Sequence, residues 1–494
     1  MTTPAATKYE VIIGIEVHAQ VRTKSKMFCS CATDYHNSPS NTHVCPICLG
    51  MPGVLPVINK RAVEMTIMTG LALNCEVPEQ AKFDRKNYPY PDLMKGYQIS
   101  EYDQPLCTGG WLEIEPDGQL KRIGITRVHL EEDTAKLIHV KSPAGESYSL
   151  VDVNRSGVPL MEVVSEPDMR SPEEARAYLV KLRQILRYLD VCAGNMEEGN
   201  FRCDANISLR PMGASELGTK VEVKNMNSFR SVYRALYHEV ERQRQILDDG
   251  GRIPQETRGW VDDQGVTASQ RSKEYANDYR YFPEPDLPPI VVDREWLEEI
   301  RAQMPELPDA KRARFLSEYG LSEYDVSLLI ETRAKADYFT AAVAHAPEAK
   351  RQKRAKAVAN WINGELTGLL HARNMGISEA KITPKALSQL IDLQEDGTIS
   401  GKTAKGVFQE MFEGGRDPEQ IVEGAHLVQI TASGEIAEAV ERVLENNAKA
   451  ADDYRGGKEE ALKFLVGQVM RETRGRANPG MVNQLLKEKL SGRP

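Results

Sequence analysis

The chain of 494 residues contains no uninterrupted apolar stretch of about 18 residues, so the sequence predicts no membrane-spanning helix. Its first residues lack the basic and then apolar layout of a secretory signal peptide. Eight cysteines are too few for a disulfide framework in a chain of this length. These absences indicate a cytoplasmic protein, and its 41% of hydrophobic residues are enough to bury a sizeable core.

Two sequence signatures of common enzyme classes are missing. The segment GTISGKT, residues 397–403, is one residue short of a phosphate-binding P-loop, and no apolar strand precedes it. We predict a turn that enters a helix at this place. No Gly-x-Ser-x-Gly nucleophile elbow occurs either. If the protein uses ATP, we therefore expect the nucleotide to bind on a β-sheet.

The net charge of −9 argues against a protein that is coated with basic residues. The charge is uneven, however, because residues 449–494 hold ten Lys and Arg against six Asp and Glu. A second basic run, KRQKRAK, covers residues 350–356. These segments are either solvated helix faces or a surface for a structured nucleic acid.

The pattern of residues changes along the chain. Up to about residue 292, short alternating runs and Gly/Pro turns predict strands, and the proline-dense segment 283–293 predicts a boundary. Beyond it, apolar residues recur every three or four positions, as in helices, with a further break at 414–420. We predict an α+β protein with an antiparallel-sheet domain at 1–292, a helical domain at 293–405 and a helical tail at 406–494.

Four of the eight cysteines stand together as Cys29-x-Cys31 and Cys45-x-x-Cys48. Two short cysteine pairs supply the ligands of a tetrahedral zinc site, with Zn–S distances of ~2.3 Å. A single Cys-x-x-Cys is compatible with redox chemistry, but such sites have no second pair, and an iron–sulfur cluster or no metal is the other alternative. Since four thiolates leave no open coordination position, we expect the zinc to be structural.

Several predicted strands carry polar side chains on one face. In VIIGIEVHAQ, Glu16 and His18 alternate with apolar residues, and in GITRVHLEED, His129 and Glu131 share a side. Glu162 follows in LVDVNRSGVPLMEVV. Each face taken alone is most simply a solvated surface, but their recurrence indicates a site.

Two further stretches extend this pattern. FRCDANISLR places Arg202, Asp204 and Asn206 on one face, and KVEVKN adds Lys224 after a plausible hairpin loop. Carboxylates and an imidazole bind Mg²⁺ and leave positions open for phosphate oxygens, which Arg and Lys then clamp. The residues predict a nucleotide and metal site on an antiparallel sheet, although the sequence does not order the strands.

Longer motifs resemble one family across nearly the whole chain. They are IGIEVHAQ, KFDRKNYPYPDLMKGYQIS, RIGITRVHLEEDTAK, LVDVNRSGVPLMEVVSEPDMRS, MEEGNFRCDANISLRP, KVEVKNMNSFR, DYRYFPEPDLPP and GQVMRETRGRANPGMVNQLL. In this order they are similar to the B subunits of bacterial and organellar aspartyl/glutamyl-tRNA amidotransferases. One departure, Thr134-Ala135 in place of Ala-Gly, affects a turn and no expected ligand.

The resemblance implies an activity, a fold and partners. Members of this family phosphorylate the side-chain carboxylate of Glu on tRNA-Gln, or of Asp on tRNA-Asn, with ATP and Mg²⁺, and ammonia then forms the amide. The ammonia comes from glutamine through an amidase, the A subunit, and an internal tunnel, and a small C subunit completes the heterotrimer. The N-terminal domain would be a cradle like the catalytic sheet of glutamine synthetase, and the helical tail would contact the misacylated tRNA.

The resemblance also assigns roles to residues. The Mg²⁺ ligands, which are the expected catalytic residues, would be Glu16, His18, Glu131 and Glu162, with Glu132 as the alternative to Glu131. By strand face and residue type, the phosphate-side candidates are Arg202, Asp204, Asn206 and Lys224. The candidates for contact with tRNA are Arg471, Arg474 and Arg476. The zinc would hold the loop after the first strand and would not be needed for the chemistry.

Two other functional classes compete with this interpretation. A non-catalytic tRNA-binding scaffold would use the same acidic residues only as structure. A zinc hydrolase needs an open coordination position and ligands that include histidine, which the cysteine quartet lacks.

Overall fold

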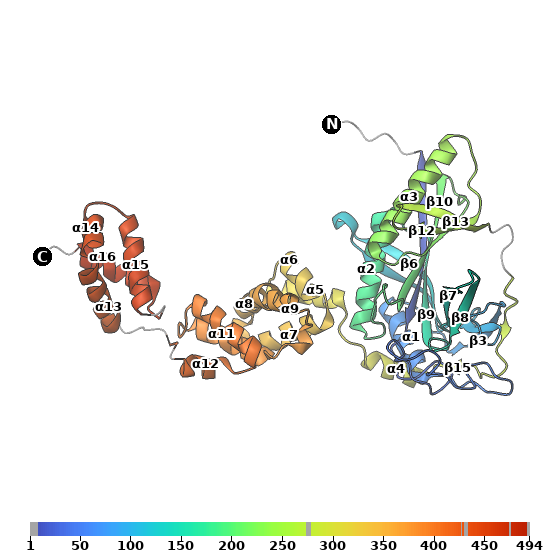
Figure 1. Ribbon diagram of the computed structural model, residues 1–494, viewed down its shortest axis with the longest axis horizontal. Coiled ribbons are helices and arrows are strands. Elements are labelled where there is room, and N and C mark those ends of the chain that lie inside the picture. The colour runs from blue at the N-terminus through green and yellow to red at the C-terminus, as the bar shows by residue number, and fades with distance from the viewer. Residues whose placement is uncertain (1–7, 273–277, 426, 429–432, 474–475, 492–494) are drawn as a thin grey trace. The chain divides into compact units, whose positions relative to one another are not determined.

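The computed structural model describes residues 8–272, 278–425, 427–428, 433–473 and 476–491. The chain separates into two compact units between Pro308 and Asp309. The first unit contains the sheet and the second consists of helices (Figure 1). Among the described residues, no helix combines the length and the apolar character that are needed to cross a membrane.

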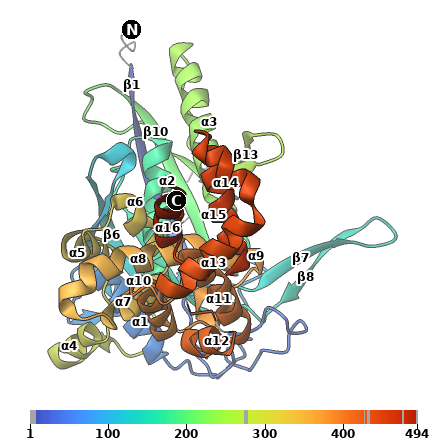
Figure 2. The same cartoon turned by 90° about the vertical axis from the view of Figure 1, so that its left-hand side faces the viewer.

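The strands found among the described residues all belong to the first unit. Their bounds are β1 (Tyr9–Gln20), β2 (Gln80–Ala81), β3 (Phe83–Asn87), β4 (Tyr97–Glu101), β5 (Cys107–Ile114), β6 (Lys121–Glu132), β7 (Lys136–Lys141), β8 (Ser147–Asp152), β9 (Pro159–Ser165), β10 (Phe201–Pro211), β11 (Val221–Lys224), β12 (Glu256–Val261), β13 (Val266–Ser272), β14 (Phe282–Pro283) and β15 (Ile290–Val291). Figure 2 shows the β7–β8 hairpin projecting away from the main sheet.

One large sheet runs in the order β13-β12-β11-β10-β1-β9-β6-β4-β3-β14, and β5 pairs with β6. Its described pairs are antiparallel except β11 and β12. Helix α3 (Phe229–Asp248) connects these two strands, and a crossover connection of this kind places them parallel. The α+β class is confirmed, whereas the predicted antiparallel sheet is a mixed one.

Three helices of the first unit lie against one face of this sheet. These are α1 (Lys60–Ala72), α2 (Pro172–Tyr188) and α3, which contact β6, β5 and β10 respectively. The sequence pattern predicted only strands in this region, and all three helices were missed. Clear start signals precede α2, because the Ser171 side chain accepts a hydrogen bond from the Glu174 N–H and Pro172 occupies the first turn.

The sheet divides its side chains between two environments. On β1, Ile13, Ile15 and Val17 are fully buried in the layer between the sheet and the helices. The alternating residues Glu16 and His18 point to the opposite side. The predicted alternation along this strand is therefore confirmed.

The helices beyond the sheet follow the predicted change of pattern near residue 293. Their bounds are α4 (Arg294–Ala302), α5 (Pro308–Tyr319), α6 (Glu323–Leu329), α7 (Arg333–Ala344), α8 (Arg351–Trp361), α9 (Thr367–Ala372), α10 (Pro384–Glu395), α11 (Gly401–Gly414), α12 (Pro418–Gly424), α13 (Ser433–Asn446), α14 (Ala448–Arg455), α15 (Glu460–Glu472) and α16 (Pro479–Ser491). The segment GTISGKT enters α11, where the Ser400 side chain accepts from the Thr403 N–H. The predicted turn and helix start are confirmed at this place.

Residues of the second unit form two separate apolar clusters. One lies between Phe315 and Val422 and the other between Ile436 and Leu490. The sheet has a third cluster of its own, which extends to Ile300. The division at 292 and 405 stays a prediction.

Candidate active site on the polar face of the sheet

Strand register brings the predicted polar residues to one side of the sheet. His18 on β1 lies opposite Glu162 on β9, and Glu162 lies opposite His129 on β6. On the other side of β1, Glu16 pairs with Asp204 of β10. Cross-strand partners point to the same side of a sheet, so these residues share one surface. We call it the polar face.

Three side chains on the polar face form a compact set that we call the carboxylate–histidine group. The ligand atoms of His18, Glu131 and Glu162 all lie within 4.8 Å of one another. His18 Nε2 is 3.5 Å from Glu162 Oε2 and 3.8 Å from Glu131 Oε1. Two carboxylates and an imidazole at this spacing have the donor types that suit a hard divalent cation such as Mg²⁺.

The charges within the carboxylate–histidine group favour a cation. Burial alone would lower the pKa of His18, but the hydrogen bond and charge of Glu162, with the charge of Glu131, raise it to about 9. Burial alone would raise the pKa of Glu162, but contact with His129 and His18 holds it well below its ordinary value. Both carboxylate side chains are nearly inaccessible to solvent, at 3% for Glu131 and 9% for Glu162. Paired negative charge in so dry a place requires a compensating positive charge, which either the protonated His18 or a bound cation provides.

His129 belongs to this surface, although the sequence-based prediction left it out of the ligand set. Its Nε2 lies 3.2 Å from Glu162 Oε2, and its side chain is 3% exposed. Arg127 Nε donates to His129 Nδ1 over 3.2 Å, which leaves Nε2 to carry the hydrogen toward Glu162. The imidazole therefore orients the Glu162 carboxylate.

Glu16 and Glu132 occupy different positions from the group. The Glu16 carboxylate accepts a hydrogen bond of 2.9 Å from Asn206 Nδ2 and lies outside the carboxylate–histidine group. Glu132 contacts Lys95 and accepts from the Ile99 N–H over 3.0 Å. Of the two adjacent glutamates on β6, the structure brings Glu131 to the group.

The phosphate-side candidates lie on β10 and β11, beside β1 on the polar face. Arg202 pairs with His18 across the strands, and its guanidinium lies 3.0 Å from Asp133 Oδ1. Lys224 Nζ lies 2.7 Å from Asp204 Oδ2 and 3.2 Å from a Glu222 oxygen. Each of the two cations thus has a carboxylate partner that fixes its position.

A buried carboxylate that was not among the predicted site residues organises this corner. Asp133 follows β6 directly, is 3% exposed, and accepts a hydrogen bond of 2.8 Å from Gln20 Nε2 in addition to the Arg202 contact. Arg155 Nε lies 3.7 Å from the same carboxylate. Burial alone would raise the pKa of Asp133, but Arg202 and Arg155 lower it. In the sequence, Asp133 was visible only as the last residue of the acidic run Glu131-Glu132-Asp133. The role of each of these residues depends on the direction in which its side chain leaves the strand.

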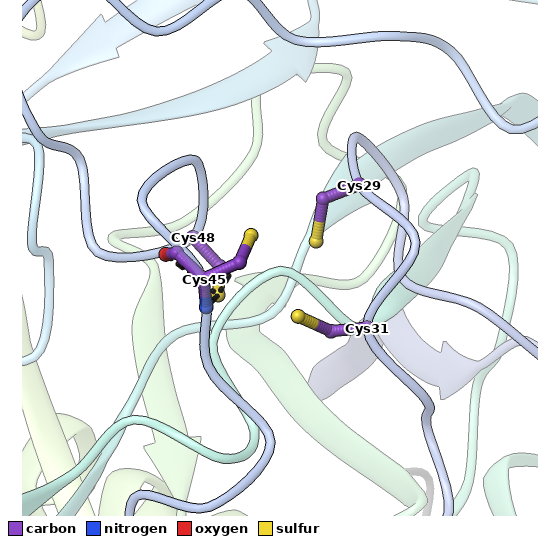
Figure 3. A group of neighbouring side chains, drawn as sticks. All are labelled: Cys29, Cys31, Cys45 and Cys48. Carbon is purple, nitrogen blue, oxygen red and sulfur yellow. Dashed lines mark hydrogen bonds between the residues drawn. The ribbon is translucent and has the colours of Figure 1, made fainter.

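The four clustered cysteines form a set that is separate from the carboxylate–histidine group, in the segment that follows β1. Cys29 and Cys31 stand on one loop and Cys45 and Cys48 on another, with the sulfur atoms facing a common centre (Figure 3). All four sulfurs lie within 4.8 Å of one another. This arrangement fits four-thiolate coordination of a zinc ion and leaves no position for a reacting water.

A buried lysine accompanies the cysteines. Lys26 is 1% exposed, and its Nζ donates to the carbonyl oxygen of His43 over 2.8 Å. The pKa of the Cys48 thiol is lowered to about 4, chiefly by a hydrogen bond from Cys29, with help from the Cys45 backbone and the charge of Lys26. Burial raises the pKa of the Cys31 thiol to about 11, and contact with Cys48 raises that of Cys29, so the clustering of the four sulfurs, and not their acidity, is what indicates a metal.

The predicted tRNA-facing arginines lie in or after α15. Arg471 is exposed near the end of the helix, and Arg476 is half-buried shortly beyond it. Arg474 lies outside the described residues. For this part of the chain, contact with nucleic acid stays a prediction.

Comparison with known proteins decides the family. A model described as the GatB/GatE catalytic domain matches residues 11–298, and a model described as a GatB domain matches residues 337–490. The B subunit of an aspartyl/glutamyl-tRNA(Asn/Gln) amidotransferase of Carboxydothermus hydrogenoformans is 58% identical over 98% of this chain and 99% of its own length. The chain belongs to the GatB family.

Other relatives show the same full-length similarity. The GatB proteins of Dehalococcoides mccartyi strain CBDB1 and Thermomicrobium roseum, also named as B subunits of aspartyl/glutamyl-tRNA(Asn/Gln) amidotransferases, are 56% and 57% identical over 98% of this chain. In each case 99% of the relative is covered. The GatB/GatE catalytic match includes the carboxylate–histidine group and the cysteines, and the resemblance stated from the motifs is confirmed.

Proposed function

We propose that this chain is the carboxylate-activating subunit of a tRNA-dependent amidotransferase. Its substrates are Glu-tRNA(Gln), Asp-tRNA(Asn) or both, in accord with the names of its relatives. The observation that carries the mechanism is the carboxylate–histidine group on the polar face, bordered by two cations of β10 and β11. That combination matches phosphoryl transfer, in which positioning and charge stabilisation supply most of the catalysis.

The reaction has two steps, and in each step one bond forms as another breaks. An oxygen of the substrate side-chain carboxylate attacks the terminal phosphorus of ATP, the P–O bond to ADP breaks, and an acyl phosphate forms. Ammonia then attacks the acyl carbon, phosphate leaves, and the nitrogen loses one proton to give the amide. The acyl phosphate is needed because a carboxylate cannot expel oxide.

The residues divide this work by charge and position. His18, Glu131 and Glu162 would hold Mg²⁺, with Glu16 two residues before His18 on β1, and the ion would supply charge neutralisation for the phosphates. Arg202 binds phosphate oxygens, and Asp133 holds the Arg202 guanidinium in position. The residues on the phosphate side, each held by a polar partner, are Arg202, Asp204, Asn206 and Lys224.

The other parts of the assembly follow from the same proposal. An amidase, the A subunit, hydrolyses glutamine to supply ammonia through a tunnel, and a small C subunit completes the heterotrimer. The cradle at 1–292 acts like the sheet of glutamine synthetase, with helical and tail domains at 293–405 and 406–494. The three separate apolar clusters support a division into three parts, with the first cluster reaching Ile300 and the second reaching Val422. Arg471 and Arg476 lie in the part that contacts tRNA.

The reconstituted complex tests this proposal. We expect Glu-tRNA(Gln), Asp-tRNA(Asn) or both to be amidated with ammonium, ATP and Mg²⁺, and neither when ATP is omitted. The Glu131→Gln variant should bind tRNA as the wild type does and form almost no amide. If Glu131→Gln forms amide at the wild-type rate, Glu131 has no part in activation. A wild-type complex that binds tRNA but consumes no ATP would favour the non-catalytic scaffold.

The cysteine quartet is proposed to hold a structural zinc ion. We expect about one zinc per chain by atomic absorption, and loss of the metal in Cys45→Ser. The variant should be destabilised by about 2 kcal/mol, which lowers the unfolding temperature by several degrees in a domain of this size. Below that temperature it should still form amide, because the zinc is not in the reaction. His36→Ala, on the exposed part of the same loop, should keep its zinc.

A further inference from the structure

A lysine on β3 extends the polar face beyond the carboxylate–histidine group. Ser100 of β4 pairs with Glu131 on one side and with Asp84 of β3 on the other. Lys86 stands two residues after Asp84, so it points to the same side as Glu131. Burial alone would lower the pKa of Lys86, but the charges of Glu131 and Glu162 raise it. Lys86 is thus within electrostatic reach of the group.

Tyr88 and Tyr279 lie beside this lysine, Tyr279 contacts Tyr281, and Tyr281 stacks on Tyr102. We call these four residues the tyrosine cluster. Lys86 Nζ lies 5.1 Å from the ring centre of Tyr279 and 5.9 Å from that of Tyr88. The rings of Tyr102 and Tyr281 are stacked, with centres 3.9 Å apart and planes 5° from parallel. Rings that only fill a core would be buried, yet Tyr102 is 51% exposed.

The backbone between Tyr279 and Tyr281 is held in a strained form. Arg280 has φ of 45°, in the left-handed region that side chains other than glycine rarely adopt. Asn87 fixes this turn, because its N–H donates to the Tyr279 oxygen over 2.9 Å and its Nδ2 donates to the Arg280 oxygen over 2.8 Å. Strain of this kind persists where surrounding contacts impose it, and it collects at ligand sites.

The tyrosine cluster lies on the opposite side of the carboxylate–histidine group from the phosphate-binding cations. In the sheet, β10 and β11 with Arg202 and Lys224 stand on one side, and β3 and β14 stand on the other. A cavity of about 220 Å³, lined in part by Glu16 and Asn206, also opens on the β1 and β10 side. Phosphoryl transfer brings the attacking and leaving oxygens in line, so donor and acceptor approach from opposite sides.

We propose that the tyrosine cluster is the stacking platform for the 3′-terminal adenosine of the aminoacyl-tRNA. This inference rests on the proposed function. An unpaired terminal base offers a π-face to aromatic side chains, and this contact does not require base pairing. Lys86, between the rings and the carboxylates, guides the carboxylate of the esterified amino acid toward the group. ATP enters from the β10 side.

Steady-state kinetics of the complex, with ammonium as nitrogen donor, test the platform. In Tyr281→Ala the KM for aminoacyl-tRNA should rise about 10-fold or more, as expected for a lost base stack, while the KM for ATP stays within about twofold. Tyr281→Phe keeps an aromatic face and should restore the tRNA KM. Tyr148→Ala removes an exposed tyrosine from the β7–β8 hairpin, away from the tyrosine cluster, and should change neither constant.

A tRNA that lacks its terminal adenosine distinguishes the loss of base stacking from a general loss of protein structure. Uncharged tRNA that lacks its terminal adenosine should compete with aminoacyl-tRNA less well than intact uncharged tRNA in the wild type. In Tyr281→Ala the two competitors should be equal, because the base and its platform act as a pair. An unchanged difference between the competitors, or a KM increase confined to ATP, overturns the inference. Failure of the proposed function is distinct, since the wild-type complex would then make no ATP-dependent amide.

Discussion

Glu162→Gln is expected to slow ATP-dependent amide formation by about 10²–10³-fold, the loss typical of removing one preorganised electrostatic contact. The replacement keeps the shape of the side chain and removes the charge that faces His18 and His129 at 3.5 and 3.2 Å. The variant should also need more Mg²⁺ to reach half of its residual rate, because one ligand is weakened. The rate of amide formation on charged tRNA, measured across a Mg²⁺ series, checks both effects.

Glu166→Gln is the matched control. Glu166 follows β9, is exposed, and accepts a hydrogen bond of 2.7 Å from Thr126 Oγ1, away from the carboxylate–histidine group. The complex that carries Glu166→Gln should form amide at the wild-type rate. Glu16 belongs to the predicted ligand set but lies outside the carboxylate–histidine group. We therefore expect Glu16→Gln to slow amide formation less than Glu162→Gln does. A Glu162→Gln rate that equals the control at every Mg²⁺ concentration would contradict this metal site.

Asp133→Asn is expected to destabilise the first unit by about 3–5 kcal/mol, the usual cost of removing one partner from a buried ion pair. The carboxylate is 3% exposed and contacts Arg202 and Gln20, so its loss leaves a guanidinium without its counter-charge. Denaturant unfolding of the wild-type complex and of the complex that carries Asp133→Asn measures the difference in the free energy of unfolding. Amide formation should fall as well, because Arg202 loses the contact that positions it.

The same variant has a defined pH dependence. The pKa of Asp133 is lower in the folded protein than in the unfolded chain, where it is about 3.9. Its stabilising contribution is therefore fully present above about pH 4 and is lost as the pH falls through the folded value. The stability difference between wild type and Asp133→Asn should narrow in acid.

A surface pair provides the comparison. Asp190→Asn removes the partner of Arg22, and both side chains are more than half exposed. It should cost no more than about 1 kcal/mol. Equal destabilisation by the buried and the exposed substitution would show that Asp133 does not hold a buried pair.

The sequence by itself determined the family, because long motifs such as MEEGNFRCDANISLRP occur in order along the whole chain. It also determined the alternation of β1, since a period of two separates Glu16 and His18 from Ile15 and Val17 without knowledge of neighbours. The cysteine spacing predicted a cluster that the structure forms. Periodicity was present for α2 and α3 as well, but the surrounding strand-rich segments dominated the interpretation of that region.

Only the tertiary structure decided which polar residues meet. His18 and Glu162 are 144 positions apart, and strand order with register sets their contact, which local pattern does not encode. Register also brought Glu131 to the group in place of Glu132, and placed Glu16 on Asn206. Lys86 and Tyr281 came together in the same way, from segments that lie far apart in the chain. Side-chain type and local face can be inferred from sequence, whereas a site assembled across a sheet depends on long-range pairing.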